Sequence, residues 1–436
     1  MNTVAIIGAG ESGVGAALLA KKNELEVFVS DYGKIREDYK EELLRNNIPF
    51  EEEGHSFEKL EKADVIVKSP GIPGTAEVIR YFRLRHKEII SEIEFASRFY
   101  DGKIIGITGS NGKTTTTKLC HHILENSGIN CAQAGNVGYS FARLLTMDAN
   151  YDWIVLELSS FQLDDINTFS SEFSVILNIT PDHLDRYDYN FKNYARSKWN
   201  LALATKSEGL LVLNRSNEIQ NILIKEFPVE CKVLWLENKD RKQLVSMETG
   251  DYFEMQIRGW HNAYNASVAV LIARRLGISD TDIDLALQTF EPVEHRMELV
   301  ASYRGIEYIN DSKSTNVDSC LVGLDSINGK LVWIAGGVDK GNDYAQLDKA
   351  LEGKLEGLVC LTTDDKKLRS HFSYLEDRIL TTENMDEAVR WAAERVGEGT
   401  VLLSPACASF DLFDNYEHRG KSFKDSVIKY LDDFDQ

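Results

Sequence analysis

The chain has 436 residues, 43% of them hydrophobic and 27% charged, which is typical of a globular protein with roughly two to four domains. Its 49 lysines and arginines face 69 aspartates and glutamates, and this net charge of −20 argues against sequence-independent binding to nucleic acid or to an anionic membrane. The six cysteines are scattered without a C-x-x-C pair, which favours reduced thiols over disulfides or a zinc site. With no signal-peptide pattern and no apolar run near the ~20 residues of a membrane span, we expect a cytoplasmic protein.

Short apolar runs recur along the whole chain and alternate with helix-like segments. Continuous Val, Ile and Leu runs are typical of strands buried on both faces of a parallel sheet. The clearest runs are residues 3–7, 27–30, 65–68, 104–108, 153–158, 175–179, 210–213, 331–335, 358–361 and 401–404. We predict an α/β protein with a Rossmann-like domain at residues 1–92, a central phosphate-loop domain with a mostly parallel sheet at 93–291, and a second Rossmann-like domain at 292–436.

The first predicted strand leads into a glycine-rich turn, Gly8-Ala9-Gly10-Glu11-Ser12-Gly13, and the next strand ends at Asp31. A G-x-G-x-x-G turn that opens a helix, with an acid after the second strand, is the dinucleotide-binding fingerprint. The pattern alone fits a nicotinamide or flavin enzyme, but UDP carries the same diphosphate and ribose as half of NAD. The later turn Ser69-Pro70-Gly71 follows the predicted strand 65–68 and is expected to line the same crevice.

A second glycine-rich turn, residues 106–115, lies between a predicted strand and a predicted helix. Its backbone N–H groups can surround a phosphate chain, Lys113 can reach the terminal phosphates, and the Thr114 hydroxyl can hold Mg²⁺. The spacing is the compact G-x-x-G-K-T, because the position five residues before Gly112 is Ile107. The pattern predicts nucleotide binding, and the alternative is an ordinary strand-to-helix turn.

Polar side chains also follow other strands of the central segment. Glu157 could hold Mg²⁺ opposite the phosphate loop, and His183, beside Asp182, could bind a metal or a phosphate. Weaker candidates for ligand contacts are Asn136, His261, Asn262 and Asn265. Composition alone predicts that Lys198 is a solvated helix residue.

In the last segment, three polar loops follow predicted strands, at residues 310–316, 336–341 and 404–411. The carboxyl ends of parallel strands meet at one edge of a sheet, so these loops are expected to form one ligand site. Lys313 and Lys340 make that site suitable for a carboxylate or a phosphate. Cys407 has no histidine close in sequence, so we expect a buried structural thiol rather than a nucleophile.

These segments, in this order along essentially the whole chain, resemble the Mur ligase family of bacterial cell-wall synthesis. The resemblance rests on residues 108–114, 157–160, 182–185, 261–265, 295–296 and 311–313. Residues 404–411, 417–420 and Phe423 further resemble the members of this family that add D-glutamate. The resemblance implies an ATP-dependent ligase that joins UDP-N-acetylmuramoyl-L-alanine to D-glutamate through an acyl phosphate, with Mg²⁺ or Mn²⁺ as cofactor. It further implies a monomer that binds these small molecules and neither nucleic acid nor a membrane.

The resemblance also assigns roles to individual residues. Those for ATP are Gly109, Ser110, Asn111, Gly112, Lys113, Thr114, Thr115, Asn262, Asn265, Arg296 and Asp311. Those for metal ions are Thr114, Glu157, His183 and Lys198, the last of which would be carbamylated by CO₂. Those for the other two substrates are Ser12, Asp31, Gly71, Asn136, Ser159, His183, Thr315, Ser409 and Tyr416. The catalytic residues would be Lys113, Glu157, His183, Lys198, Lys313 and Lys340.

The chain departs from the family pattern after Asp31, where Tyr32-Gly33 replaces a small hydroxyl residue and an arginine, and Lys34 or Arg36 is the expected substitute. Two other functions stay open at this point. One is a nicotinamide-dependent oxidoreductase, which the first glycine turn favours but which leaves the second glycine turn unexplained. The other is a different ligase of the same superfamily, such as one that adds another amino acid or a folylpolyglutamate synthase.

Overall fold

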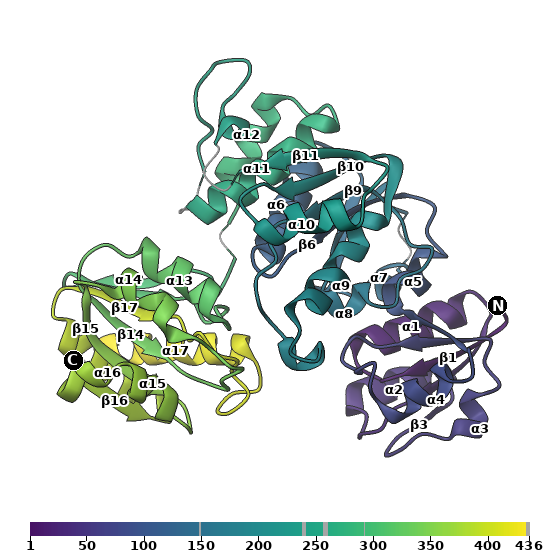
Figure 1. Ribbon diagram of the computed structural model, residues 1–436, viewed down its shortest axis with the longest axis horizontal. Helices are drawn as coiled ribbons and strands as arrows, with labels where there is room; N and C mark the ends of the chain where they lie inside the picture. The colour runs from purple at the N-terminus through teal and green to yellow at the C-terminus, as the bar shows by residue number, and fades with distance from the viewer. Residues whose placement is uncertain (148–149, 238–240, 256–259, 292, 433–436) are drawn as a thin grey trace. The chain divides into compact units, whose positions relative to one another are not determined.

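The computed structural model describes residues 1–436 except 148–149, 238–240, 256–259, 292 and 433–436. The chain forms two compact units, Met1–Phe290 and Glu291–Gln436. The first unit contains two separate sheets and the second contains one (Figure 1). The predicted α/β class with mostly parallel sheets is confirmed, whereas the boundaries between the three predicted domains stay predictions. Pro292, at the second of these boundaries, lies outside the described residues.

The first sheet has the strand order β3-β2-β1-β4-β5, and its strands pair in parallel. The strands are β1 (Thr3–Ile7), β2 (Glu26–Ser30), β3 (Phe50–Glu51), β4 (Val65–Lys68) and β5 (Glu88–Ser91), and the helices are α1 (Glu11–Lys22), α2 (Glu37–Arg45), α3 (Phe57–Leu60), α4 (Glu77–Arg83) and α5 (Glu92–Ser97). The strand order reverses at β1, between β2 and β4. The turn at Gly8 therefore opens at the topological switch point, where ligands of such sheets bind.

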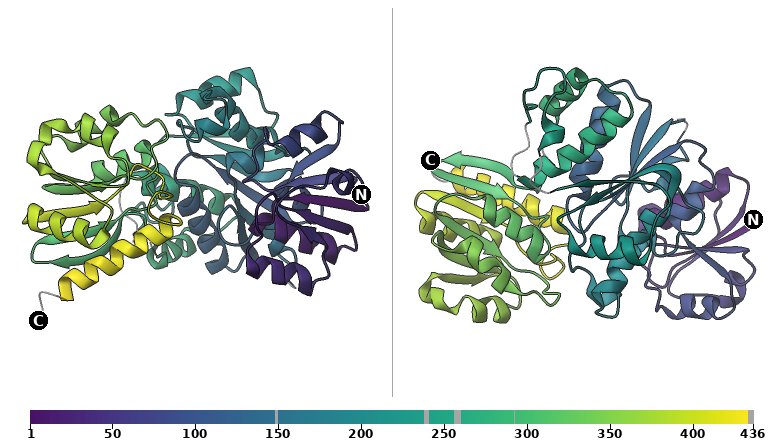
Figure 2. Two further views of the ribbon diagram at one scale, coloured as in Figure 1. Left: turned by 90° about the horizontal axis from the view of Figure 1, so that it is seen from below. Right: turned by 45° about the horizontal axis from the view of Figure 1, so that its top comes forward.

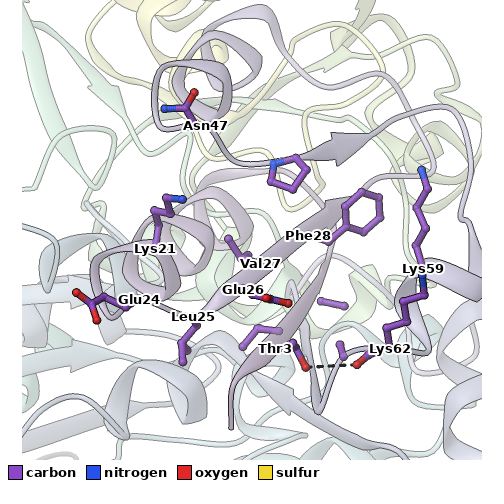
Figure 3. Close-up of a pocket in the computed structure, with 14 residues that line it drawn as sticks. Thr3, Lys21, Glu24, Leu25, Glu26, Val27, Phe28, Asn47, Lys59 and Lys62 are labelled. Carbon is purple, nitrogen blue, oxygen red and sulfur yellow. Dashed lines mark hydrogen bonds between the residues drawn. The ribbon is translucent and has the colours of Figure 1, made fainter.

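A cavity of about 700 Å³ lies at the opposite, amino edge of this sheet (Figure 3). It is lined among others by Thr3 and Glu26, the first residues of β1 and β2, and by Lys21, Phe28 and Lys59. Because the glycine turn follows the carboxyl end of β1, this cavity is separate from the crevice that the sequence predicts.

The central sheet has the order β11-β10-β9-β6-β8-β7 and is parallel throughout the described pairs. Its strands are β6 (Lys103–Thr108), β7 (Cys131–Gly135), β8 (Trp153–Glu157), β9 (Ser171–Ile176), β10 (Thr205–Asn214) and β11 (Lys232–Leu236). Its helical segments are α6 (Lys113–Asn126), α7 (Phe141–Leu144), α8 (Ser160–Leu163), η1 (Leu184–Arg186), α9 (Phe191–Leu203), α10 (Glu218–Glu226), η2 (Lys242–Leu244), α11 (Trp260–Arg275) and α12 (Asp280–Thr289). With β6 between β8 and β9, the carboxyl ends of these strands bring the phosphate loop, Glu157 and the segment after Ile176 to one edge.

The third sheet has the order β12-β13-β17-β14-β15-β16, with β12 and β13 antiparallel and the other pairs parallel. Its strands are β12 (Glu298–Tyr303), β13 (Ile306–Asn310), β14 (Leu331–Ala335), β15 (Leu355–Leu361), β16 (Ile379–Thr382) and β17 (Gly399–Leu403). Its helical segments are α13 (Val317–Ser326), η3 (Tyr344–Leu347), α14 (Asp348–Leu351), α15 (Lys366–His371), η4 (Ser373–Arg378), α16 (Met385–Val396) and α17 (Tyr416–Asp432). Two apolar cores lie on its two faces, one packed by α13 and the other by α16 and α17, the yellow C-terminal helix of Figure 2. No helix among the described residues is long and apolar enough to cross a membrane.

The strands predicted at residues 3–7, 65–68 and 331–335 have exactly these bounds, whereas the one predicted at 175–179 is wrong by several residues. That strand is β9, and it ends at Ile176. Leu177 and Ile179 are buried although they lie beyond its end, so the apolar run continues where the strand does not. Between them, the Asn178 side chain forms hydrogen bonds with the Asn111 backbone of the phosphate loop.

Within the first unit, the first and central sheets are joined by close contacts between α1 and α7. A Cβ on Gly15 of α1 would lie 2.3 Å from the Ser140 hydroxyl, so only glycine permits this approach. Arg143 of α7 donates hydrogen bonds to Glu11 at 2.8 Å and to Glu42 at 2.6 Å. The two parts of this unit are therefore held together by a close backbone approach and by a half-buried ion-pair network.

Glu92, the first residue of α5, is buried at the same junction. One carboxylate oxygen accepts a hydrogen bond from the Ala142 backbone N–H at 2.5 Å, and the other has no hydrogen-bond partner among the described residues. Burial raises the pKa of Glu92 to about 8, and Glu11 nearby adds to the increase. The native unit therefore favours the protonated carboxyl.

In the Glu92→Gln variant, the free energy of unfolding is expected to fall less steeply with rising pH than in the wild type. In the native state Glu92 keeps its proton up to about pH 8, whereas an unperturbed glutamate loses it near pH 4.5. Unfolding thus releases a proton between these values, and the contribution of Glu92 to the free energy of unfolding falls by up to about 1.4 kcal/mol per pH unit. Urea unfolding followed across this range measures the slope.

The matched control is Glu77→Gln, because Glu77 begins α4 as Glu92 begins α5 but is exposed. It should keep the wild-type slope. Identical slopes for the wild type and Glu92→Gln would show that Glu92 does not titrate in this way.

Candidate active site

The phosphate loop lies between β6 and the N-terminus of α6. Gly112 caps α6 with φ +87°, a left-handed conformation that favours glycine. A Cβ there would also lie 2.7 Å from Oδ1 of Asn265 on α11. The loop is therefore packed tightly against α11 and opens on the N-terminus of a 14-residue helix, a favourable position for an anion.

The segment after β9 holds the loop in shape. The Asn178 side chain accepts a hydrogen bond from the Asn111 N–H at 2.8 Å and donates one to the Asn111 carbonyl at 2.9 Å. The Ser110 hydroxyl donates to the Thr180 carbonyl at 2.9 Å and lies 2.9 Å from the Tyr194 hydroxyl. These contacts hold the backbone of the loop in one conformation.

Two lysines reach the loop from different helices. Lys113 of α6 donates to the carbonyls of Gly109 at 2.8 Å and Ser110 at 2.9 Å. Lys198 of α9 donates to the same Gly109 carbonyl at 2.9 Å. Burial and, to a smaller extent, the charge of Lys113 hold the pKa of Lys198 well below its usual range. The prediction from composition that Lys198 is solvated is wrong, because α9 packs this side chain inward, only 2% exposed.

Glu157 ends β8 and is 1% exposed. Its Oε1 accepts a hydrogen bond from the Asn136 side chain at 2.8 Å, and its Oε2 has no hydrogen-bond partner in the described part of the chain. A buried carboxylate oxygen without a donor, beside a phosphate loop, fits a divalent cation. No group of three or more His, Cys, Asp or Glu residues among those described could hold a metal, so phosphate and hydroxyl oxygens would complete the ligand set.

His183 lies at the start of η1 with φ +51°. Its ring meets the Phe161 ring edge to face, with 5.0 Å between the ring centres. Its Nε2 lies 3.6 Å from the Asp182 carboxylate. A left-handed backbone at a residue other than glycine is uncommon, and such conformations are concentrated at functional loops.

In the first sheet, the Asp31 carboxylate accepts hydrogen bonds from the Ala9 N–H at 2.6 Å and the Gly33 N–H at 2.8 Å. It thus links the glycine turn to the loop after β2. Ser12 lies in the first turn of α1, Gly71 is exposed in the turn after β4, and Ser159 caps α8.

The two substitutes expected for the missing arginine are engaged at the surface. Lys34 lies 3.9 Å from Glu53, and Arg36 pairs with Asp38. All of these side chains are exposed, so the pairs contribute little to stability.

The remaining ATP candidates are divided between the two units. In the first unit, Asn262 and Asn265 are buried on α11, with 3.5 Å between the Asn265 Nδ2 and the Asn262 Oδ1. In the second unit, the Arg296 Nε is buried and finds no acceptor within the described residues, as expected of a donor kept for a ligand.

In the second unit, Asp311 follows β13 and is buried. It accepts hydrogen bonds from the hydroxyls of Ser314 at 2.5 Å and Ser404 at 2.8 Å. Burial raises the pKa of Asp311 to about 6, so the carboxyl titrates close to neutrality.

Arg419 of α17 is a site residue that composition and spacing do not indicate. Its guanidinium, 1% exposed, donates to the carbonyls of Ser312 at 2.9 Å, Gly336 at 3.3 Å and Cys407 at 3.1 Å. These carbonyls belong to the three polar loops predicted to form one site, and Arg419 joins them. Only its position in the segment 417–420, which resembles the Mur ligases, could have indicated it.

Around these loops lie the candidates for the amino-acid substrate. Lys313 lies 5.0 Å from the centre of the Tyr416 ring, Ser409 is buried, Thr315 is half-buried and Lys340 is exposed. Cys407 is buried, as predicted, and burial raises the pKa of its thiol to about 11. A protonated, buried thiol is a poor nucleophile.

Three family models match in chain order: the MurD N-terminal domain at residues 3–78, the Mur ligase middle domain at 107–273, and the Mur ligase glutamate ligase domain at 295–407. A UDP-N-acetylmuramoylalanine–D-glutamate ligase from Christiangramia forsetii is 42% identical over 97% of this chain and 98% of its own. One from Porphyromonas gingivalis is 43% identical over 98% of both chains. The chain belongs to the Mur ligase family.

Solved Mur ligases share the fold at much lower identity. UDP-N-acetylmuramate-alanine ligase MurC from Thermotoga maritima has a TM-score of 0.61 and 19% identity, over 99% of both chains. MurF from Acinetobacter baumannii has a TM-score of 0.62 and 16% identity, over 96% of this chain and 93% of its own. The three-part architecture implied by the resemblance is thus shown by both sequence and fold.

Gly112→Ala is expected to weaken the binding of inorganic tripolyphosphate by about tenfold. The alanine strains a left-handed backbone, and its Cβ collides with Asn265. Isothermal titration calorimetry gives the dissociation constant.

The matched control is Gly128→Ala near the other end of α6, where φ is +78° but no atom lies within 4 Å of the added Cβ. This variant bears similar backbone strain and should bind tripolyphosphate as the wild type does. Equal affinities for all three proteins would place the anion elsewhere.

Proposed function

We propose that the protein adds D-glutamate to UDP-N-acetylmuramoyl-L-alanine at the expense of ATP, a step in the synthesis of bacterial peptidoglycan. The observation that carries this proposal is the near full-length similarity, at 42–43% identity, to enzymes named for this reaction. The match to the MurD N-terminal domain supports the same member of the family, and it favours the proposal that the first glycine turn binds a UDP substrate rather than a nicotinamide.

The chemistry explains why the site gathers cations and N–H groups. A carboxylate is a poor acyl donor, so its oxygen first attacks the γ-phosphorus of ATP, which gives an acyl phosphate and ADP. The amine of D-glutamate then attacks the acyl carbon, and the tetrahedral intermediate expels phosphate and loses a proton. The phosphoryl group carries negative charge throughout, so Lys113 and the N–H groups at the start of α6, from Gly112 to Thr115, would stabilise it electrostatically.

The anionic candidates would organise the metal ions. A divalent cation, Mg²⁺ or Mn²⁺, would neutralise charge on the transferred phosphoryl group, and Thr114 with the unpaired oxygen of Glu157 would hold it. Lys198 is proposed to react with CO₂ at Nζ, losing a proton and becoming an anionic group that serves a second cation with His183. Its burial, which favours the uncharged amine, supports this proposal.

The second unit is proposed to bind D-glutamate and part of ATP. Lys313, Thr315, Lys340, Ser409 and Tyr416 would surround the amino-acid carboxylates and the acyl centre. Arg296 and Asp311 are proposed contacts of ATP, as are Asn262 and Asn265 of the first unit. Ser12, Asp31, Gly71, Asn136 and Ser159 are proposed contacts of the UDP-linked substrate.

The decisive test is phosphate release from ATP by the purified chain. Release should require both UDP-N-acetylmuramoyl-L-alanine and D-glutamate, and omission of either should abolish it. Release that depends on L-glutamate or meso-diaminopimelate instead would assign the chain to another branch of the family.

Lys113→Ala is expected to lower phosphate release to background, because no other side chain of the loop carries a positive charge to the phosphates. Lys118→Ala, on the same helix beyond its first turn, should remain active and serves as the control. Substantial turnover by Lys113→Ala would refute the role of this lysine.

Lys198→Ala is expected to be largely inactive and to regain partial activity in the presence of acetate or formate, which would replace the lost anionic group. Lys192→Ala, at an exposed position of the same helix, should behave like the wild type. Wild-type activity of Lys198→Ala would remove the proposed carbamate.

A further inference from the structure

The turn after β4 in the first sheet is held by charged side chains of the central part of the same unit. Lys68, the last residue of β4, lies 2.6 Å from the Asp165 carboxylate, and both side chains are buried. Arg83 of α4 also pairs with Asp165, at 2.8 Å. The strand end that leads into Ser69-Pro70-Gly71 is therefore anchored outside its own sheet.

Arg186 holds the other side of this turn. Its guanidinium donates to the Gly71 carbonyl at 3.2 Å and to the Pro70 carbonyl at 3.4 Å. It also lies over the Phe161 ring, 4.5 Å from the ring centre. The planar fork of arginine suits two successive carbonyls together with an aromatic face, a combination that lysine cannot reproduce.

A continuous series of contacts passes through this turn. On one side, the Ser69 hydroxyl donates to the Gly8 carbonyl at 3.0 Å, in the glycine turn. On the other side, Arg186 stacks on Phe161, whose ring meets that of His183. The glycine turn and the His183 loop are thus connected through the Pro70–Gly71 turn and one arginine.

This connection between the glycine turn and the His183 loop is important for a substrate that has to contact both of them. Under the proposed function, on which this inference rests, the UDP of the acceptor lies at the glycine turn and its reacting carboxylate lies near the phosphate loop and His183. A fixed separation between the two loops favours acceptors whose ends are separated by the matching length.

We propose that Arg186 is a positioning residue that fixes the Pro70–Gly71 turn relative to His183 and thereby sets the acceptor length that the site accepts. It acts through the turn and the Phe161 ring rather than on the reacting atoms. Without it, the acceptor itself has to order the turn, so acceptor binding weakens while the chemical step in the bound complex is retained.

The test compares Arg186→Ala with the wild type in steady-state phosphate release. The KM for UDP-N-acetylmuramoyl-L-alanine should rise about tenfold, while kcat and the KM values for ATP and D-glutamate stay within about twofold. The preference in kcat/KM over UDP-N-acetylmuramate, which is one alanine shorter, should fall by a similar factor. Arg186→Lys should show a smaller increase, since it keeps the charge but loses the fork.

UDP alone is the probe that separates positioning from direct contact. Positioning predicts that UDP binds to Arg186→Ala and to the wild type with affinities within about twofold. If UDP binding weakens as much as acceptor binding, Arg186 contacts the diphosphate, and the proposal is overturned. Arg215→Ala is the matched control, because it removes an exposed arginine from the ring of Trp235 in the same unit and should change none of these values.

Two further results would count against the proposed role of Arg186. Unchanged acceptor kinetics in Arg186→Ala, or an equal loss toward every substrate with a lower melting temperature, would overturn the proposal. Should the alanine variant not fold, Arg186→Gln provides the same comparison. An inactive wild-type chain would overturn the proposed function, and this inference with it, whereas an active wild type with an unaffected variant overturns the inference alone.

Discussion

The candidate active site depends on two lysine side chains that donate hydrogen bonds to one carbonyl oxygen of the phosphate loop. Lys113 and Lys198 both donate to the Gly109 carbonyl, at 2.8 and 2.9 Å. Burial and, to a smaller extent, the charge of Lys113 disfavour the charged form of Lys198, so the second lysine is held there as an uncharged amine. The loop therefore offers an anion the ammonium group of Lys113 and the N-terminus of α6, while Lys198 beside it stays available as an uncharged amine.

This arrangement requires a rigid loop, and the rigidity comes from the neighbouring strands. Because β6 lies between β8 and β9, the loop that leaves β6 meets Glu157 on one side and Asn178 on the other. The Asn178 side chain forms hydrogen bonds with both the N–H and the carbonyl of Asn111. The Ser110 hydroxyl donates a hydrogen bond to the Thr180 carbonyl. A loop fixed in this way loses little conformational entropy when a nucleotide binds.

In the second unit the loops of the candidate site are also held in place, but by an arginine side chain. There the loops after β13, β14 and β17 have to be held at one edge of the sheet, and Arg419 does so by donating to a carbonyl of each. A buried arginine can satisfy several carbonyls at once because its donors form a fixed planar fork. The first unit uses the same property at Arg186, which bridges two carbonyls of one turn. In both places a guanidinium holds loops of the candidate site together through their backbone carbonyls.

Apolar runs and glycine spacing are local properties, so they were enough to predict the mostly parallel sheets, the two glycine turns and the order of the polar loops. Composition gave the wrong prediction for Lys198 and no indication of Arg419. A long cationic side chain points into water or into a loop according to which segments pack against its helix. The sequence pattern of the helix itself does not contain that information. The unpaired oxygen of Glu157 and the turn held by Arg186 likewise exist only after the strands have been placed side by side. The tertiary structure thus decided which polar groups are buried together, since burial and partnership arise between segments that are distant in the chain.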